Sequence, residues 1–171
     1  TLAKLEHAGD SDSELYFFRL ALYHEDMHAE SFAHLRQLLG YPAPLERPHG
    51  PASLPDGDED VALPGAEFEQ GALRHVGGFV FDNEKWAHRV SVRDVRIRRH
   101  PVTQAAFLAF VEDGGYLRDD LWSVAGRAWR DHARATHPAY WRRAGAHWQQ
   151  RVFDRWEPLR LSAAMAHVTA H

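Results

Sequence analysis

The sequence predicts an α+β protein in which one long helix precedes short strands and shorter helices. Residues 10–39 repeat apolar side chains with the period of an α-helix. Residues 61–68, 77–84 and 88–97 have β-type composition, and residues 88–97 alternate apolar and polar side chains. Residues 104–112 return to the helical pattern. A helical region followed by a mixed α+β region is therefore expected.

Composition restricts the classes of function. The chain has 171 residues, 44% of them hydrophobic, so it can bury a core. It contains no cysteine, and any metal must therefore be bound by His, Asp, Glu or water, a set of ligands that suits iron or zinc. A net charge of -4 without a basic run predicts no nucleic-acid partner. Because no apolar run reaches the ~20 residues of a membrane span and no signal peptide is visible, we expect no membrane association and a cytoplasmic protein.

Both ends of the sequence suggest a piece of a longer protein. The chain begins with Thr1 rather than methionine and stops at His171 without a terminating signal. Between them we expect three parts: a helical segment at residues 1–42, a proline-rich linker at 43–60 and an α+β region at 61–171.

The segment 10–39 has the start and stop signals of a helix. Ser11 and Glu14 have the spacing of a capping box, and Gly40 with Pro42 supplies the end. About 28 residues give a length of roughly 42 Å, which is typical of a helical bundle. At 100° per residue one apolar face contains Phe17, Leu20, Ala21, His24, Met27, His28, Ser31 and Leu35.

The later part of the chain contains weaker signals. Thr103 is expected to cap a helix at 104–112, which ends at Gly114. A second short helix is expected at 119–129 and a strand at 148–153, with the rest of that region irregular.

Two histidines carry the strongest chemical signal. His24 and His28 lie four residues apart, so one helix face presents two imidazoles to a metal. A core in which both rings only make hydrogen bonds is the plain alternative. The same letters spell HExxH, the zinc-peptidase motif, in which Glu25 is the general base. His34 has the position of the third ligand in the long form of that motif, but Ser31 replaces the glycine that this form needs to turn the chain.

Three further groups are candidate sites with structural alternatives. Asp82, Asn83 and Glu84 are expected to form a turn rather than an ion site. Arg142 and Arg143 are expected to be solvated rather than to bind a carboxylate. Five tryptophans could form an aromatic cage for a trimethylammonium group, although a place in the core is the simpler expectation: Trp122, Trp129, Trp141, Trp148 and Trp156.

Several of these segments, in order, resemble one enzyme family. The resemblance rests on residues 22–30 (LYHEDMHAE), 78–88 (GFVFDNEKWAH), 101–107 (PVTQAAF) and 110–116 (FVEDGGY). This set is similar to the ergothioneine sulfoxide synthases and the related selenoneine synthases. In that family a DinB-like helical bundle precedes a domain similar to the formylglycine-generating enzyme, with a C-type-lectin-like fold. The resemblance implies that both domains are incomplete here.

The resemblance implies a mononuclear non-heme Fe(II) centre held by three histidines. His24 and His28 match two of them. The third histidine and the catalytic tyrosine are expected outside residues 1–171. The implied reaction uses O2 as co-substrate to join a thiol or selenium donor to the imidazole carbon of hercynine, and an iron with open positions suits this chemistry.

One departure from the family pattern concerns substrate binding. The ergothioneine enzymes read HEQQH where this chain reads HEDMH, so Met27 replaces a glutamine that contacts hercynine. A thioether cannot donate the hydrogen bonds of an amide. Together with residues 84–88, this difference favours the selenoneine synthase type with a selenosugar donor. Ergothioneine sulfoxide synthase with a thiol donor is the first alternative, and a zinc metallohydrolase is the second.

Overall fold

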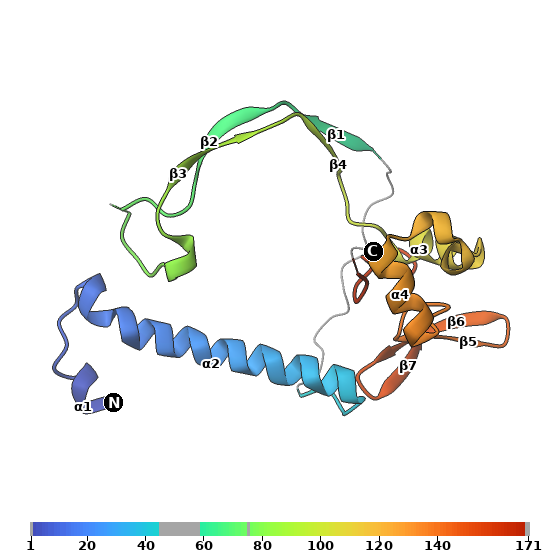
Figure 1. Cartoon of the computed structure of the whole chain (residues 1–171). Helices are drawn as coiled ribbons and strands as arrows, with labels where there is room; N and C mark the ends of the chain where they lie inside the picture. The colour runs from blue at the N-terminus through green and yellow to red at the C-terminus, as the bar shows by residue number, and fades with distance from the viewer. Residues whose placement is uncertain (1, 45–58, 75, 170–171) are drawn as a thin grey trace. The chain divides into compact units, whose positions relative to one another are not determined.

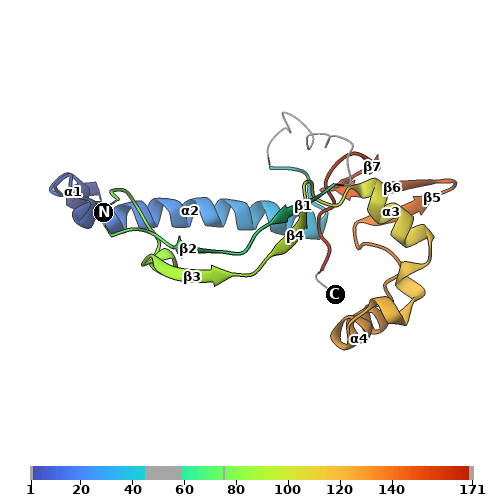
Figure 2. The ribbon, with the colours of Figure 1, turned by 90° about the horizontal axis from the view of Figure 1, so that it is seen from above.

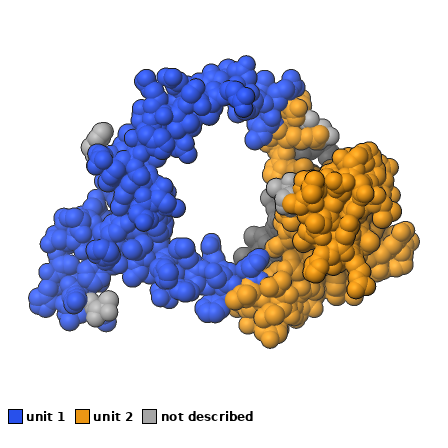
Figure 3. Space-filling model, in the orientation of Figure 1, with its two compact units in different colours: residues 1–34, 61–97 blue, residues 35–60, 98–171 orange. Residues whose placement is uncertain are grey.

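The computed structural model describes residues 2–44, 59–74 and 76–169 (Figure 1). The chain divides into two compact units, of which the first contains residues 1–34 and 61–97 and the second residues 35–60 and 98–171 (Figure 3). Each unit contains both helices and strands, which confirms the α+β class. Most of the expected linker, residues 45–58, lies outside the described residues, and the three-part division stays a prediction.

The expected long helix is present as α2 (Asp12–Leu39), after a short helix α1 (Leu2–Leu5) that was not predicted. Ser11 caps α2, because its Oγ accepts the Glu14 backbone N–H at 3.3 Å. The reverse bond of the capping box is replaced by a bond from the Ser11 hydroxyl to the Glu14 carboxylate. Gly40 ends the helix with a left-handed φ of 71°. None of the described helices is long and apolar enough to cross a membrane.

The β-type segments of the first unit form two strand pairs. β1 (Asp60–Leu63) pairs with β4 (Val95–Arg98), and β2 (Ala66–Gln70) pairs antiparallel with β3 (His88–Val92) (Figure 2). The expected strands at 61–68 and 88–97 are therefore each interrupted once. At the interruption the Gly65 N–H donates to Asp94 Oδ1 at 2.6 Å, and a Cβ on Gly65 would lie 2.8 Å from the Val92 carbonyl oxygen.

The expectation of β structure at residues 77–84 is wrong. This segment is irregular and leads into a 3-10 turn, η1 (Asp82–Glu84). The Phe81 N–H donates to Glu84 Oε2 at 2.9 Å, and this side-chain bond takes the place of a strand partner. The turn predicted at Asp82, Asn83 and Glu84 is confirmed.

Helix α3 (Gln104–Glu112) has the predicted bounds, whereas the next helix does not. Thr103 caps α3 by accepting the Ala106 N–H at 3.2 Å, and Gly114 follows it with φ 76°. A helix was expected at 119–129, but α4 spans Val124–Ala133, because Ser123 is its N-cap and accepts the Gly126 N–H at 3.0 Å. The preceding residues form 3-10 turns, η2 (Gly115–Leu117) and η3 (Asp119–Leu121).

A three-stranded antiparallel sheet completes the second unit. It contains β5 (Trp141–Ala144), β6 (His147–Val152) and β7 (Arg155–Pro158) in the order β5-β6-β7. The prediction of a strand at 148–153 is confirmed within one residue, but β5 and β7 were expected to be irregular. Both are four residues long and rich in tryptophan and arginine, so neither shows apolar alternation.

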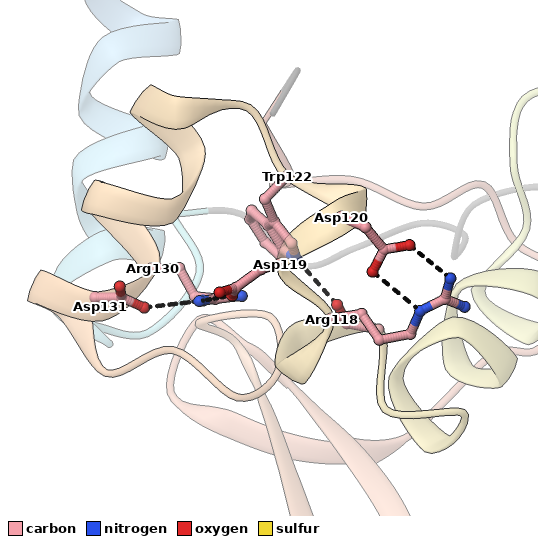
Figure 4. A network of polar contacts seen from close by, with 7 residues as sticks. Arg118, Asp119, Asp120, Trp122, Arg130 and Asp131 are labelled. Atoms are coloured by element: carbon pink, nitrogen blue, oxygen red, sulfur yellow. Dashed lines mark hydrogen bonds and ion pairs between the residues drawn. The ribbon is translucent and has the colours of Figure 1, made fainter.

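A polar network lies beside the buried aromatic residues of this unit (Figure 4). The Arg130 side chain is only 10% exposed and forms ion pairs with Asp119 at 2.6 Å and Asp131 at 2.9 Å. These two carboxylates, Asp119 first, raise the pKa of the Arg130 guanidinium. Nearby, the Trp122 indole N–H donates to the Gly115 carbonyl at 2.9 Å. Through Arg130 the network holds α4 against η3, and the Trp122 bond ties the residue after η3 to η2.

Thr103→Ala is expected to destabilise the second unit because α3 loses its N-cap bond. The expected cost is about 1 kcal/mol, which lowers the unfolding temperature by about 2–4 °C in a chain of this size. Thermal unfolding followed by circular dichroism measures the change. Thr103→Ser keeps a hydroxyl at the cap and is the matched control. An equal loss in both variants would contradict the capping role.

Candidate functional site

The two candidate metal ligands lie one turn apart in the middle of α2, the long helix of Figure 1. No glycine or proline interrupts α2 between Asp12 and Leu39, so the helix is continuous through the pair. The ring centroids of His24 and His28 are 4.5 Å apart, and the ring planes are at 77°. Two imidazoles in this arrangement fit two positions in the coordination shell of an iron or zinc ion.

The histidine face of α2 is exposed in the described part of the chain. His24 and His28 are exposed, and so are Phe17 and Leu35 on the same face, at 74% and 45%. The apolar residues of this face therefore lack the cover that a bundle helix has. Burial does not force the two rings to share a partner here, and the metal assignment rests on their spacing and proximity.

The continuous helix points His34 away from the histidine pair. α2 continues through Ser31, whose hydroxyl donates to the Met27 carbonyl oxygen at 2.9 Å. At 100° per residue, His34 then points about 80° from His24 and about 120° from His28. In the described part of the chain no three His, Asp or Glu side chains gather as a metal site. The third ligand is thus not identified within these residues.

Glu25 and Met27 flank the pair on different sides of the helix. Both side chains are exposed, and Met27 has 51% of its surface accessible. Glu25 follows His24 directly and so points about 100° away from it. Met27 is closer in direction to the apolar face, where its thioether presents a polarisable surface without a hydrogen-bond donor.

The start of α2 is attached to the irregular segment that precedes η1. The Gly78 backbone N–H donates to Asp12 Oδ2 at 2.9 Å, and Arg19 pairs with the same carboxylate. The Gly78 N–H, followed by Arg19, holds the pKa of Asp12 below its ordinary value. Tyr16 and Tyr23 contact Phe79 of the same segment. Sequence patterns gave no signal for these contacts, because the partners are far apart in the chain.

The other candidates have structural partners. Trp122 and Trp141 are buried, at 9% and 4% exposure, which confirms the core interpretation for these two. Arg142 is exposed, donates to the Gln149 side chain and lies 4.0 Å from the centroid of the Trp156 ring. Two tryptophan pairs, each with centroids 6.2 Å apart, are formed by Trp122 with Trp129 and by Trp141 with Trp148.

Comparison with known proteins identifies the family. Residues 48–155 match the model of the sulfatase-modifying factor enzyme 1-like domain, which is more than half of the chain. The chain belongs to this family. The resemblance to the formylglycine-generating enzyme predicted from the motifs is thereby confirmed.

Individual relatives agree with this assignment. The chain is 33% identical over 138 residues to the hercynine oxygenase of Mycolicibacterium smegmatis. The aligned stretch covers 76% of this chain and 31% of the relative. The hercynine oxygenase of Mycolicibacterium thermoresistibile is 33% identical over 135 residues, with 76% and 30% covered. The formylglycine-generating enzyme of Mycobacterium tuberculosis is 41% identical over 59 residues, with 34% and 18% covered. The chain spans about a third of the length of the two hercynine oxygenases.

Asp12→Asn is expected to make the stability of the first unit less dependent on pH. The pKa of Asp12 is lowered in the folded chain, so its ionised form favours folding above its unfolded-state pKa of ~3.9, and the benefit is lost as pH falls through the folded-state pKa. The wild type should therefore unfold at higher temperature than Asp12→Asn near neutral pH, and the difference should close in acid. Thermal unfolding across this pH range measures it.

Asp10→Asn is the matched control, because it removes the same charge from an exposed residue just before the helix. An identical pH response of the two variants would contradict the role of Asp12.

Proposed function

We propose that the chain is part of an Fe(II)- and O2-dependent enzyme that joins sulfur or selenium to the imidazole carbon of hercynine. The observation that carries this proposal is the 33% identity, over 138 residues, to a protein named hercynine oxygenase. The HxxxH pair on an uninterrupted helix supports it from the structure. Hercynine and a selenosugar or thiol are thus the proposed small-molecule substrates.

His24 and His28 are the proposed iron ligands. Their neutral nitrogens are borderline donors that suit Fe(II), and one helical turn places both on the same side of α2. Iron held in this way supplies the redox chemistry that a reaction with O2 needs. The third ligand and the catalytic acid are proposed to lie outside residues 1–171.

Residues 1–42 are proposed to be a segment of a DinB-like bundle. The exposed apolar side chains of α2 support this, since a bundle helix buries such residues against neighbouring helices. They include Phe17, Leu22, Phe32, Leu35 and Leu38. Against such neighbours, the His24 and His28 face would be dry, and each imidazole would keep a fixed orientation.

Met27 is proposed to contact the substrate and to influence the choice of donor. It precedes His28 and is half exposed, so it can border a molecule bound near the pair. Its thioether offers dispersion contacts in place of the amide hydrogen bonds in the ergothioneine enzymes. We therefore favour the selenoneine synthase type and a selenosugar donor.

His28→Ala is expected to weaken Fe(II) binding by about tenfold or more, because it removes one of two ligands on α2. Iron stoichiometry after anaerobic reconstitution measures binding, and O2-dependent consumption of hercynine measures activity. The protein expressed from its complete coding sequence is the sample for both. His34→Ala is the matched control, since it removes an imidazole from a different face of the same helix.

Full iron binding by His28→Ala would contradict the ligand assignment. Tightly bound zinc, with hydrolysis that continues after oxygen is removed, would favour the zinc metallohydrolase instead.

The wild-type enzyme is expected to prefer a selenosugar over a thiol as the partner of hercynine. A preference of about tenfold or more in kcat/KM is the size that differences in a few pocket contacts can produce. Parallel assays with both donors, with the products separated by mass, measure it. Turnover with the thiol alone would contradict the selenium assignment and favour ergothioneine sulfoxide synthase.

A further inference from the structure

A cluster of aromatic side chains and one lysine joins α2 to the segment between β2 and β3. We propose that this cluster sets the rotation of α2 about its axis and thereby positions His24 and His28. We call it the aromatic clamp and define it as Tyr16, Tyr23, Phe79, Phe81 and Lys85. All five residues belong to the first unit. The inference rests on the proposed function, because it concerns the same histidines.

Phe79 is the centre of the aromatic clamp. Its ring stacks on Tyr16 with centroids 5.2 Å apart and lies 4.9 Å from the ring of Tyr23. It also meets Phe81 edge-on at 4.8 Å. Phe79 is half-buried although it belongs to an irregular segment, so its burial depends on these rings.

Two further contacts extend the clamp along α2. The Lys85 ammonium nitrogen lies 4.2 Å from the centroid of the Tyr16 ring, within the range of a cation–π contact. Tyr23 also reaches Phe81, with centroids 5.9 Å apart. Together with the bond from the Gly78 N–H to Asp12, these contacts hold α2 over about 16 Å, the rise between Asp12 and Tyr23. Attachment along three turns resists rotation as well as tilting.

The clamp and the histidines occupy different faces of α2. At 100° per residue, the three attached residues Asp12, Tyr16 and Tyr23 point within about 40° of one another. The mean direction of His24 and His28 lies about 120° from theirs. The clamp therefore holds the back of the helix and leaves the imidazoles uncovered. Since Tyr23 precedes His24 directly, rotation of α2 against the clamp would move both rings by the same angle.

Phe79 and its partners hold α2 but are not proposed to bind the metal. They are therefore positioning residues. Their loss should change the geometry of bound metal while both imidazoles are still present. A residue with only a structural role would lower stability without changing the spectrum of a bound metal. The two roles are therefore separable by experiment.

The test is Phe79→Ala in the complete protein, with Co²⁺ as the probe. We expect the variant to bind Co²⁺ about tenfold more weakly than the wild type, with a shifted visible absorption spectrum at saturation. Hydrogen exchange of the amides of residues 16–28 should be faster. Phe79→Tyr keeps the ring and should restore the wild-type affinity and spectrum. Phe68→Ala is the matched control, since it removes a ring of β2 that is 46% exposed.

Unchanged affinity and spectrum in Phe79→Ala would overturn the proposal. If Phe79→Ala does not fold, Lys85→Met serves as the second variant, because it removes the cation–π contact with Tyr16. It should give a smaller change in the same direction. No change in Lys85→Met would also overturn the proposal. If the wild type binds no Co²⁺, the proposed function and the positioning of a metal fail together. If the wild type binds Co²⁺ through His28 and Phe79→Ala behaves like the wild type, the proposed function stands and the clamp fails.

Discussion

The packing of Phe79 against Tyr16 and Tyr23 is the contact on which the geometry of the first unit depends. Without it, α2 would be joined to the segment between β2 and β3 mainly by the more distant ring contact of Tyr23 with Phe81, by the Lys85 contact with Tyr16 and by the exposed bond from Gly78 to Asp12. Exposed polar contacts resist rotation weakly, because water competes for every partner. Stacked rings exclude water and keep a defined separation, so they can hold a helix that carries the proposed metal ligands on another face.

The last turn of α2 is held by a different kind of contact within the second unit. Gln37 is buried, at 8% exposure, and accepts the Phe153 N–H at 2.7 Å while its amide donates to the Arg151 carbonyl at 3.2 Å. Arg151 in turn donates to the Leu38 carbonyl at 3.1 Å, near the end of the helix. Helix ends need such partners because their final carbonyl groups have none within the helix. One helix therefore takes part in both units, through rings in one and through hydrogen bonds in the other.

Family membership and the candidate site support the proposed chemistry from different directions. The family match covers residues 48–155 and so does not include the histidine pair. The pair is supported by its own geometry, a 4.5 Å ring separation on a continuous helix. The exposed apolar face around it is what a helix of a larger bundle would show. For this reason the metal assignment is best tested through ligand variants, and the family assignment through substrate assays.

Much of the local structure could be predicted from the sequence, since its causes lie within a few residues. The extent of α2, the Thr103 cap of α3 and the turn at Asp82 follow from periodicity, caps and turn residues. So does the closeness of His24 and His28, which one helical turn guarantees. The strands β5 and β7 and the aromatic clamp were decided only by tertiary structure. Each depends on partners far apart in the chain, and no local pattern records which distant side chains will meet.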